Sequence, residues 1–462
     1  MRVFVAGATG VVGHRAVSRL VAAGHEVTGI GRAPEKDALL RSLGATPVRV
    51  SLFDPDALRA AVAGHDAVVN LATHIPPLTQ MPRLSAWAEN EKIRREASGH
   101  LVDAAIAAGA TIFVQESLAF VYGEHGDRLL DATNTPWNDD APFNEAVHIA
   151  EENVARFTAQ GGRGVVLRFG RFYAPDSEQA EAMVRTARRG GAVDVGPPES
   201  YAPMIDADDA ASAVVAALAV PAGIYDVVED VATTRAEQRT ALAAAVGRRR
   251  LWPPPAWMTP KMASYLTASQ RVSNARFRDA SGWHPGSPSV REGFPKLVRE
   301  MRVEPALPGR VRLLLWILVV SAFGVGFQAA FFPRSFYDDF PFGRGWVAMD
   351  GRYNEHLIRD VGALNLALLV LTLGALWVGT RAIARITALS WLAYSIPHWV
   401  YHLRHLSMPM SGAEKVAVMV SLSVPILAAL LILFDRTKPK PVVVDLRDEG
   451  DPVNLTTVSA GN

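Results

Sequence analysis

Three glycines near the start of the chain, Gly7, Gly10 and Gly13, have a type and spacing that can bind phosphate. They follow the apolar run Met1–Val5 and lead into an apolar stretch, from Ala16 onward, that is typical of a helix. A glycine lets backbone approach a pyrophosphate because it has no Cβ, and a helix N-terminus presents free N–H groups to the anion. The alternative, an ordinary glycine-rich turn, explains the strand–turn–helix context less well. We therefore expect a dinucleotide pyrophosphate to lie against Gly7, Ala8, Thr9, Gly10, Val11, Val12 and Gly13.

The end of the next predicted strand, His25–Arg32, bears on which dinucleotide binds. In NAD sites an acidic residue at this place binds the ribose 2′-hydroxyl, whereas a nearby arginine suits the 2′-phosphate of NADP. The chain has Arg32 and no acid at the strand end, although Glu35 follows closely. This favours NADP(H) over NAD(H). The alternative is that Arg32 is only a solvated charge.

The strands and helices that must position these residues are predicted to alternate along the chain. Predicted strands at Val48–Asp54, Ala67–Ala72 and Ile112–Gly123 are separated by segments typical of helices. Such alternation predicts an α/β fold with a Rossmann-type, doubly wound parallel sheet.

The turn has Thr9 where a second glycine would stand, and this variant resembles the extended branch of the short-chain dehydrogenase/reductase superfamily, the epimerases and dehydratases. The resemblance covers about residues 1–300 and includes the Val121-Tyr122-Gly123 block. It implies that Asp54 lies near the adenine, and that Leu71 and Ala72 lie beneath the cofactor. Asp54 has an equally good alternative, as the N-cap of a helix that starts at Pro55.

The resemblance also implies a catalytic triad, which this chain lacks. Relatives carry Ser or Thr four residues before the tyrosine of that block, and Tyr-x-x-x-Lys on the next helix. Here Leu118 takes the first place, and the best alignment puts Asn144 and His148 at the other two. No Tyr-x-x-x-Lys is found between residues 100 and 200.

Other residues are candidates to replace the missing groups. His148 is a workable general base near neutral pH, and Tyr122 and Ser117 lie in the matching block, with Ser117 facing away from Leu118 on a strand. For each of them a packing or surface role is the alternative, and glutamates flank His148 as on a solvated helix face. Weaker candidates are Glu116, Glu145 and Tyr173.

The resemblance places a first domain at residues 1–305. Its segments near 171–205 and 230–300 are expected to form a small substrate lobe.

Four apolar segments follow Pro308, and their lengths approach the roughly 20 residues that cross a bilayer. They predict an all-α, four-helix transmembrane domain at residues 306–435 and a flexible tail at 436–462. Pro397 and His398 make the third segment the least regular. The segments are Val311–Phe332, Val361–Gly379, Ile386–Tyr401 and Val416–Phe434.

Basic residues flank these segments on alternate connections. If every segment spans, the arginines before the first span, those between the second and third, and the basic residues after the fourth all lie on one side. The positive-inside rule then places the N-terminal domain and the tail in the cytoplasm, with the protein integral to the cytoplasmic membrane. The N-terminus enters a strand at once and has no predicted signal segment.

His398, His402 and His405 lie on one face of the third segment by helical spacing. A metal or haem site that adds Glu355 or His356 is one interpretation. The other, that these histidines end the span at the interface, fits their place near the segment end, so no metal site is assigned.

The overall charge excludes little. The chain has 47 Lys and Arg residues and 46 Asp and Glu residues, a net charge of +1, so charge does not indicate nucleic acid as a partner.

Two hypotheses on function follow from these features. The first hypothesis is a membrane-anchored NADP(H)-binding oxidoreductase or isomerase with a non-standard active site and an apolar or lipid-linked small-molecule substrate. The second is a catalytically silent NADP(H)-binding sensor or scaffold coupled to the membrane helices.

Overall fold

The computed structural model describes residues 1–77, 80, 83–135, 144–254, 267–301, 307–405 and 410–435. The chain forms two compact units, Met1–Glu304 and Pro305–Asn462, called unit 1 and unit 2 below.

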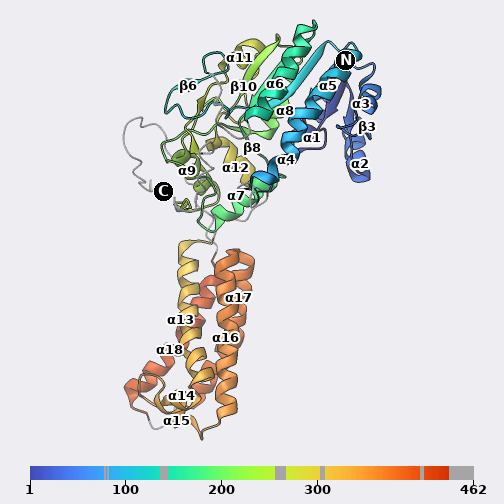
Figure 1. The fold of residues 1–462 in the computed structure, drawn as a ribbon. Helices are drawn as coiled ribbons and strands as arrows, with labels where there is room; N and C mark the ends of the chain where they lie inside the picture. The colour runs from blue at the N-terminus through green and yellow to red at the C-terminus, as the bar shows by residue number, and fades with distance from the viewer. Residues whose placement is uncertain are drawn as a thin grey trace. The chain divides into compact units, whose positions relative to one another are not determined.

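Unit 1 is built on a seven-stranded parallel sheet in the order β10-β7-β5-β4-β1-β2-β3 (Figure 1). The order reverses beside β1, which makes the crevice beyond the carboxyl ends of β1 and β4 the expected place for a ligand. The predicted doubly wound sheet is confirmed. The strands are β1 (Arg2–Ala6), β2 (Glu26–Ile30), β3 (Thr46–Val48), β4 (Ala67–Asn70), β5 (Ile112–Leu118), β7 (Arg163–Phe169) and β10 (Gly223–Val227).

Helices cover both faces of this sheet because alternate strand residues point to opposite sides. Val3 and Val5 of β1 belong to a core shared with α1, α2 and α8. Phe4, between them, belongs to a second core shared with α3, α5 and α6. The helices are α1 (Val11–Ala22), α2 (Pro34–Ser42), α3 (Pro55–Val62), α5 (Ser98–Ala107), α6 (Asn144–Ala159) and α8 (Ala207–Ala217).

Some strands are shorter than predicted. β3 ends at Val48, and Asp54 instead starts α3, where its Oδ1 accepts a hydrogen bond from the Ala57 N–H at 3.0 Å. The local signals at Asp54 and Pro55 start a helix, so the expected strand over Val48–Asp54 was wrong. β5 likewise ends at Leu118, and the residues up to Gly123 form a turn.

The remaining elements of unit 1 form a small lobe and the segment that leads into α5. Tyr173 and Phe294 pack edge to face in the core of the lobe. A π-helical turn, η2, interrupts the helix that precedes α5. These elements are η1 (Leu84–Trp87), α4 (Ala88–Lys92), η2 (Ile93–Ala97), β6 (Leu129–Leu130), β8 (Arg171–Tyr173), α7 (Glu178–Arg188), β9 (Met204–Asp206), α9 (Arg235–Ala245), β11 (Arg271–Val272), α11 (Ala275–Ser281) and α12 (Val290–Glu300).

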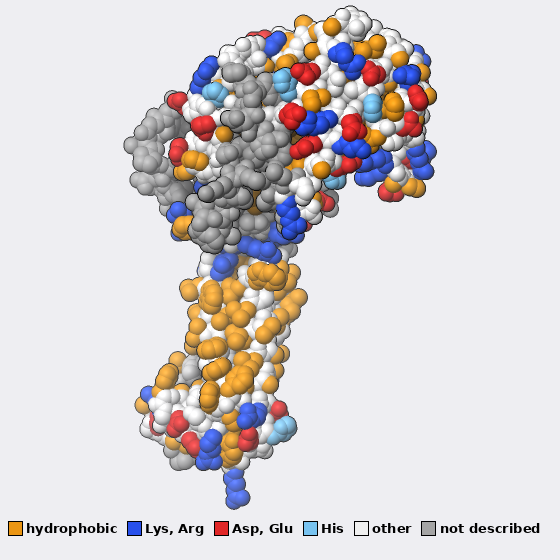
Figure 2. Space-filling model, in the orientation of Figure 1, with side chains coloured by type: hydrophobic (Ala, Val, Ile, Leu, Met, Phe, Trp, Pro, Cys, Tyr) orange, Lys and Arg blue, Asp and Glu red, His pale blue; other side chains and the backbone are white. Residues whose placement is uncertain are grey.

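Unit 2 is helical. Across residues 307–405 and 410–435, the helices long and apolar enough to cross a membrane are α13, α16 and α18. Apolar side chains of these helices cover much of the surface of unit 2 that Figure 2 shows. The elements are α13 (Gly309–Phe331), α14 (Pro333–Asp339), α15 (Trp346–Asp350), α16 (Glu355–Val378), α17 (Arg381–Arg404) and α18 (Gly412–Leu433).

The third predicted span departs from this pattern. It lies within α17, a continuous helix of 24 residues that carries Arg381 and Arg385 in its first turns and Arg404 at its end. These charges lower its hydropathy, so three of the four predicted spans are supported by length and composition. α17 still packs against α16 and α18 as part of the bundle.

Small residues bring α13 and α16 close together. A Cβ on Gly362 would lie 2.4 Å from the Ala330 nitrogen. Buried polar groups are also satisfied between helices, as where the Trp391 indole N–H donates to the Thr372 hydroxyl at 2.9 Å. Both features are typical of helix packing in membranes. His398 lies between Tyr394 and His402, and no group of three metal-ligating side chains is found among the described residues.

Candidate functional site

The glycine turn is held between β1, α1 and β4 with no room for side chains. Gly7 has φ +74°, and a Cβ there would lie 2.4 Å from the Leu71 carbonyl carbon. A Cβ on Gly13 would lie 2.0 Å from the Gly7 oxygen. Gly10 precedes α1 and has no side chain to cap its first N–H groups, so these remain available to an anion.

The other residues predicted around the cofactor are brought together only in part. Leu71 and Ala72, which were predicted to lie beneath the cofactor, are buried directly behind Gly7. Asp54 caps α3 and is exposed, so the capping alternative is confirmed. Arg32 is exposed two residues beyond the end of β2.

The end of β2 also lies beside an acid that the sequence pattern does not indicate. Asp37 of α2 is 5% exposed, and its Oδ1 lies 2.2 Å from where a Cβ on Gly31 would be. Its Oδ2 accepts a hydrogen bond from Arg49 Nε at 2.8 Å. Asp37 Oδ1 has no hydrogen-bond partner in the described part of the chain. A buried carboxylate thus occupies the space that an acidic residue ending β2 would fill.

Ser117 and Tyr122 lie in a buried polar network. The Ser117 hydroxyl donates to Glu151 Oε1 at 2.5 Å, and the Tyr122 hydroxyl donates to Asp226 Oδ1 at 2.7 Å. Arg168 joins both, since its Nη2 donates to Glu151 at 2.8 Å and its Nη1 donates to the Tyr122 oxygen at 2.9 Å. Each side chain is therefore held in place by charge-assisted bonds.

The electrostatics of this network keep Tyr122 protonated. Burial raises the pKa of Asp226 to about 7, and burial together with the nearby Asp226 raises the pKa of Tyr122 above its usual range. A phenol in this state donates a hydrogen bond and does not act as a base at neutral pH.

The two residues of α6 that align with the Tyr and Lys of the triad, Asn144 and His148, lie on different faces of the helix. Asn144 is buried, and its Nδ2 donates to the Val121 carbonyl at 3.0 Å, which ties α6 to the turn that carries Tyr122. The His148 side chain is 52% exposed, and its Nε2 lies 3.6 Å from Glu152 Oε1. Leu118 is half-buried against the cluster that contains Tyr122.

The weaker candidates each have a partner. Glu116 is buried and pairs with Arg94 Nη2 at 2.8 Å. Glu145 is exposed and pairs with Arg95, which lowers its pKa. Tyr173 is buried and donates to Glu229.

Comparison with known proteins identifies the family. The sequence model of the NAD dependent epimerase/dehydratase family matches residues 3–227. A 3-diazoavenalumate denitrifying reductase from Streptomyces sp. is 34% identical over 312 residues, which cover 64% of this chain and 99% of that protein. The chain belongs to the NAD dependent epimerase/dehydratase family.

Solved structures of this family agree with the fold. The human epimerase family protein SDR39U1, solved with NADPH, is 26% identical with a TM-score of 0.55, covering 65% of this chain and 99% of its own. The UDP-glucose 4-epimerase of Thermus thermophilus, solved with NAD, is 23% identical with a TM-score of 0.55 over 66% and 99%. Family membership supports a nicotinamide dinucleotide as the cofactor, and the glycine turn fits one because no side chain caps the N–H groups that begin α1.

The sequence patterns did not predict several of the charged residues that lie in or near this buried network. Arg168 and Asp226 lie inside otherwise apolar strands, and that interruption was an available signal. Glu151 was noted only as a flanking charge of His148, yet it faces inward with Asn144 on α6. Arg94 lies in the π-helical turn η2, and such turns are frequent at functional sites.

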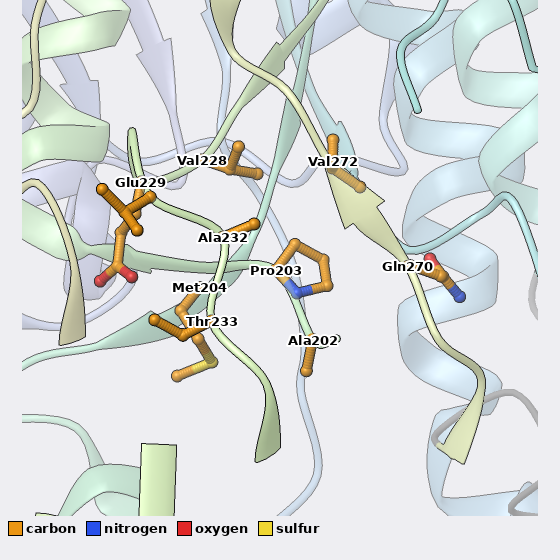
Figure 3. Close-up of a pocket in the computed structure, with 10 residues that line it drawn as sticks. Ala202, Pro203, Met204, Val228, Glu229, Ala232, Thr233, Gln270 and Val272 are labelled. Carbon is orange, nitrogen blue, oxygen red and sulfur yellow. The ribbon is translucent and has the colours of Figure 1, made fainter. Parts of the chain in front are cut away.

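The small lobe contains a narrow pocket that has room for about one water molecule before it opens to solvent. Glu229 and Gln270 lie on opposite sides of it, with Pro203 and Val228 between them (Figure 3). Glu229 accepts hydrogen bonds from the Tyr173 hydroxyl at 2.7 Å and the Val290 N–H at 2.9 Å. Burial nevertheless raises the pKa of Glu229 to about 8.

Proposed function

We propose that this protein is a membrane-anchored, NADP(H)-dependent oxidoreductase with a non-standard active site. The observation that carries the proposal is the glycine turn, where a Cβ on Gly7 or Gly13 would collide with backbone although the N–H groups of α1 stay free. A nicotinamide dinucleotide held by this turn would supply or accept a hydride at its nicotinamide ring. The similarity to a reductase over 99% of that protein's length supports redox chemistry over epimerisation.

The cofactor contacts follow from this arrangement. The N–H groups of Val11, Val12 and Gly13 hold the pyrophosphate, and Leu71 and Ala72 form the floor. Arg32 pairs with the 2′-phosphate, which favours NADP(H). Arg49 supports this choice because its ion pair neutralises Asp37, a carboxylate that would otherwise repel the phosphate.

The reaction proceeds without the usual Tyr–Lys acid. Leu118 cannot donate a hydrogen bond and Asn144 has no titrating proton. An acceptor that is already electrophilic takes a hydride without being protonated first, so the missing acid suits a reduction of this kind. His148 is the candidate group where a proton must move: it accepts the proton when a substrate is oxidised and, once protonated, donates it when a substrate is reduced. Tyr122 and Ser117 position the surrounding residues.

The substrate is proposed to be apolar or lipid-linked, because unit 2 holds the protein at a bilayer. The apolar helices α13, α16 and α18 support this placement. The protein is proposed to lie in the cytoplasmic membrane, and the arginines that begin α13 and α17 favour an orientation with unit 1 and the tail in the cytoplasm.

The test is NADPH oxidation by the detergent-solubilised chain with quinones, aldehydes and sterol-like ketones. With aldehydes and ketones, which take up a proton as well as a hydride, His148→Ala should lower turnover about 100-fold, the scale of general acid–base loss, while NADPH binding stays unchanged. For these substrates wild-type turnover should fall as pH rises, because reduction consumes a proton and only the protonated imidazole can donate it. His284→Ala, an exposed histidine of unit 1, is the matched control. Full turnover in His148→Ala would rule this base out.

A second function is supported by the buried network. Ser117 and Tyr122 are both bound to carboxylates inside the protein, as in a structural core. This suits a catalytically silent NADP(H) sensor that acts on unit 2. Tight NADPH binding without turnover, together with NADPH-dependent thiol labelling of cysteines placed in unit 2, would favour it.

A further inference from the structure

A pocket at one end of unit 2 lies between α13, α17 and α18. Arg381 and Arg385 of α17 line it together with Asp435, which follows α18. The recess has room for about one water molecule before it opens to solvent, so a larger group would bind at its mouth. Val311, Ala384 and Ile432 give the pocket an apolar side. Two guanidinium groups therefore border an apolar recess at the end of three helices.

The acid in this pocket is already neutralised. The Asp435 side chain is 7% exposed, and its Oδ1 lies 2.5 Å from Arg310 Nη2. Arg381 and Arg385 add positive charge beyond that pair. An arginine has five N–H donors, so Arg381 can keep a partner within the protein and still donate to a phosphate.

Charge is distributed unevenly between the two ends of unit 2. Among the described residues of unit 2, the pocket end has four arginines against Asp435, a formal excess of three positive charges. The opposite end has six basic and six acidic residues and is formally neutral. The four arginines are Arg310, Arg312, Arg381 and Arg385. The residues of the opposite end are Arg334, Arg344, Arg352, Arg359, Arg404, Lys415, Asp338, Asp339, Asp350, Glu355, Asp360 and Glu414.

Exposed apolar side chains continue along the helices from the pocket. Leu313 of α13 is 63% exposed, Ile386 of α17 is 56% exposed, and Leu431 of α18 is 61% exposed. Each lies within two residues of a pocket-lining residue. A ligand that combines an anionic phosphate with long apolar chains matches both parts of this surface.

We propose that the pocket binds the headgroup phosphate of an anionic phospholipid. Arg381 and Arg385 donate to the phosphate oxygens in the fork geometry that guanidinium groups favour, and the acyl chains lie against the apolar helix surfaces. Basic pockets between transmembrane helices are recognised sites for such headgroups. The inference rests on the proposed membrane placement of unit 2.

The experiment uses the purified full-length chain and an acyl-labelled phosphatidylglycerol, with the equally labelled phosphatidylcholine as the neutral comparison. Each arginine near an anionic surface contributes about 1 kcal/mol, which is about fivefold in affinity. Arg381→Gln and Arg385→Gln should each weaken phosphatidylglycerol binding about fivefold, and the double variant about 30-fold. Phosphatidylcholine binding should be unaffected. Circular dichroism helix content and a thermal unfolding curve that match the wild type would show that the helices of unit 2 still fold in the variants.

Two control variants separate the pocket from general charge. Arg312→Gln removes an arginine of the same end that does not line the pocket, and Arg352→Gln removes an exposed arginine of the opposite end. Both should bind phosphatidylglycerol as the wild type does. An equal loss in Arg312→Gln and Arg385→Gln would overturn the pocket in favour of diffuse attraction.

Lipid selectivity, competition by phosphate and insertion into vesicles test the headgroup site further. Equal binding of the two lipids would overturn the headgroup site. Displacement of phosphatidylglycerol by inorganic phosphate at the same affinity would assign the site to free phosphate. Failure of the chain to insert into neutral phosphatidylcholine vesicles would contradict the membrane placement itself, which is a separate result from insertion without lipid preference.

Discussion

Replacing Arg32 by alanine tests the cofactor assignment most directly. A hydrogen bond to a charged group contributes about 1.5–3 kcal/mol. Arg32 is exposed, and solvent screening places its contribution at the lower end, about 1.5 kcal/mol or about tenfold in affinity. Arg32→Ala should therefore weaken NADPH binding about tenfold and leave NADH binding unchanged.

The neighbouring ion pair sharpens this prediction. Removing Arg49 leaves the buried Asp37 carboxylate without its cation, so Arg49→Ala should also lower the preference for NADPH. Asp37→Asn removes the repelling charge and should raise that preference. Arg41→Ala, an exposed arginine of α2, is the charge-matched control and should change neither affinity.

The assay is titration of the purified chain with NADPH and NADH by nicotinamide fluorescence at two salt concentrations. The preference should shrink at high salt because exposed charges are screened. Equal affinities for the two cofactors in the wild type would refute the role of Arg32. An equal loss of both affinities in Arg32→Ala would show a structural effect instead.

Three further predictions address the turn, the lobe and the membrane placement. Gly13→Ala should abolish cofactor binding in calorimetry, because its Cβ would meet the Gly7 oxygen at 2.0 Å, whereas Gly99→Ala in α5 has room and should bind normally. The raised pKa of Glu229, about 8 against 4.5, means that folded unit 1 holds this proton more tightly than the unfolded chain. Stability should therefore fall as pH rises from 5 to 8, by up to about 1.4 kcal/mol per pH unit, and denaturant unfolding of Glu229→Gln should show a flatter profile. In intact cells an impermeant thiol reagent should label Arg352→Cys and spare Ser459→Cys; the reverse would overturn the orientation.

Local signals made the core of unit 1 predictable. Alternating apolar strands and helices specify a parallel sheet, and the glycine spacing follows from a steric need that Gly7 and Gly13 show directly. The boundaries were less certain because caps compete with strand propensity, as at Asp54. The missing triad could also be predicted, since it requires only residue types at aligned positions.

The candidate site was predictable only where its residues are neighbours in sequence. Tyr122 and Asp226 are separated by 104 residues, and nothing local indicates that they form a hydrogen bond. Asp37 lies on a helix after the strand end where an acid was sought, and only the packing of α2 places its carboxylate beside Gly31.

The sequence by itself determined the family, the glycine turn, the absent Tyr–Lys pair and the apolar segments, because each depends on residue type and short-range periodicity. The tertiary structure decided which charges meet. It buried Ser117 and Tyr122 in one network, left His148 on the outer face of α6, and gathered Arg310, Arg385 and Asp435 at one end of unit 2. These contacts join distant segments through packing, so their charges and partners are specified by the folded chain and not by any local pattern.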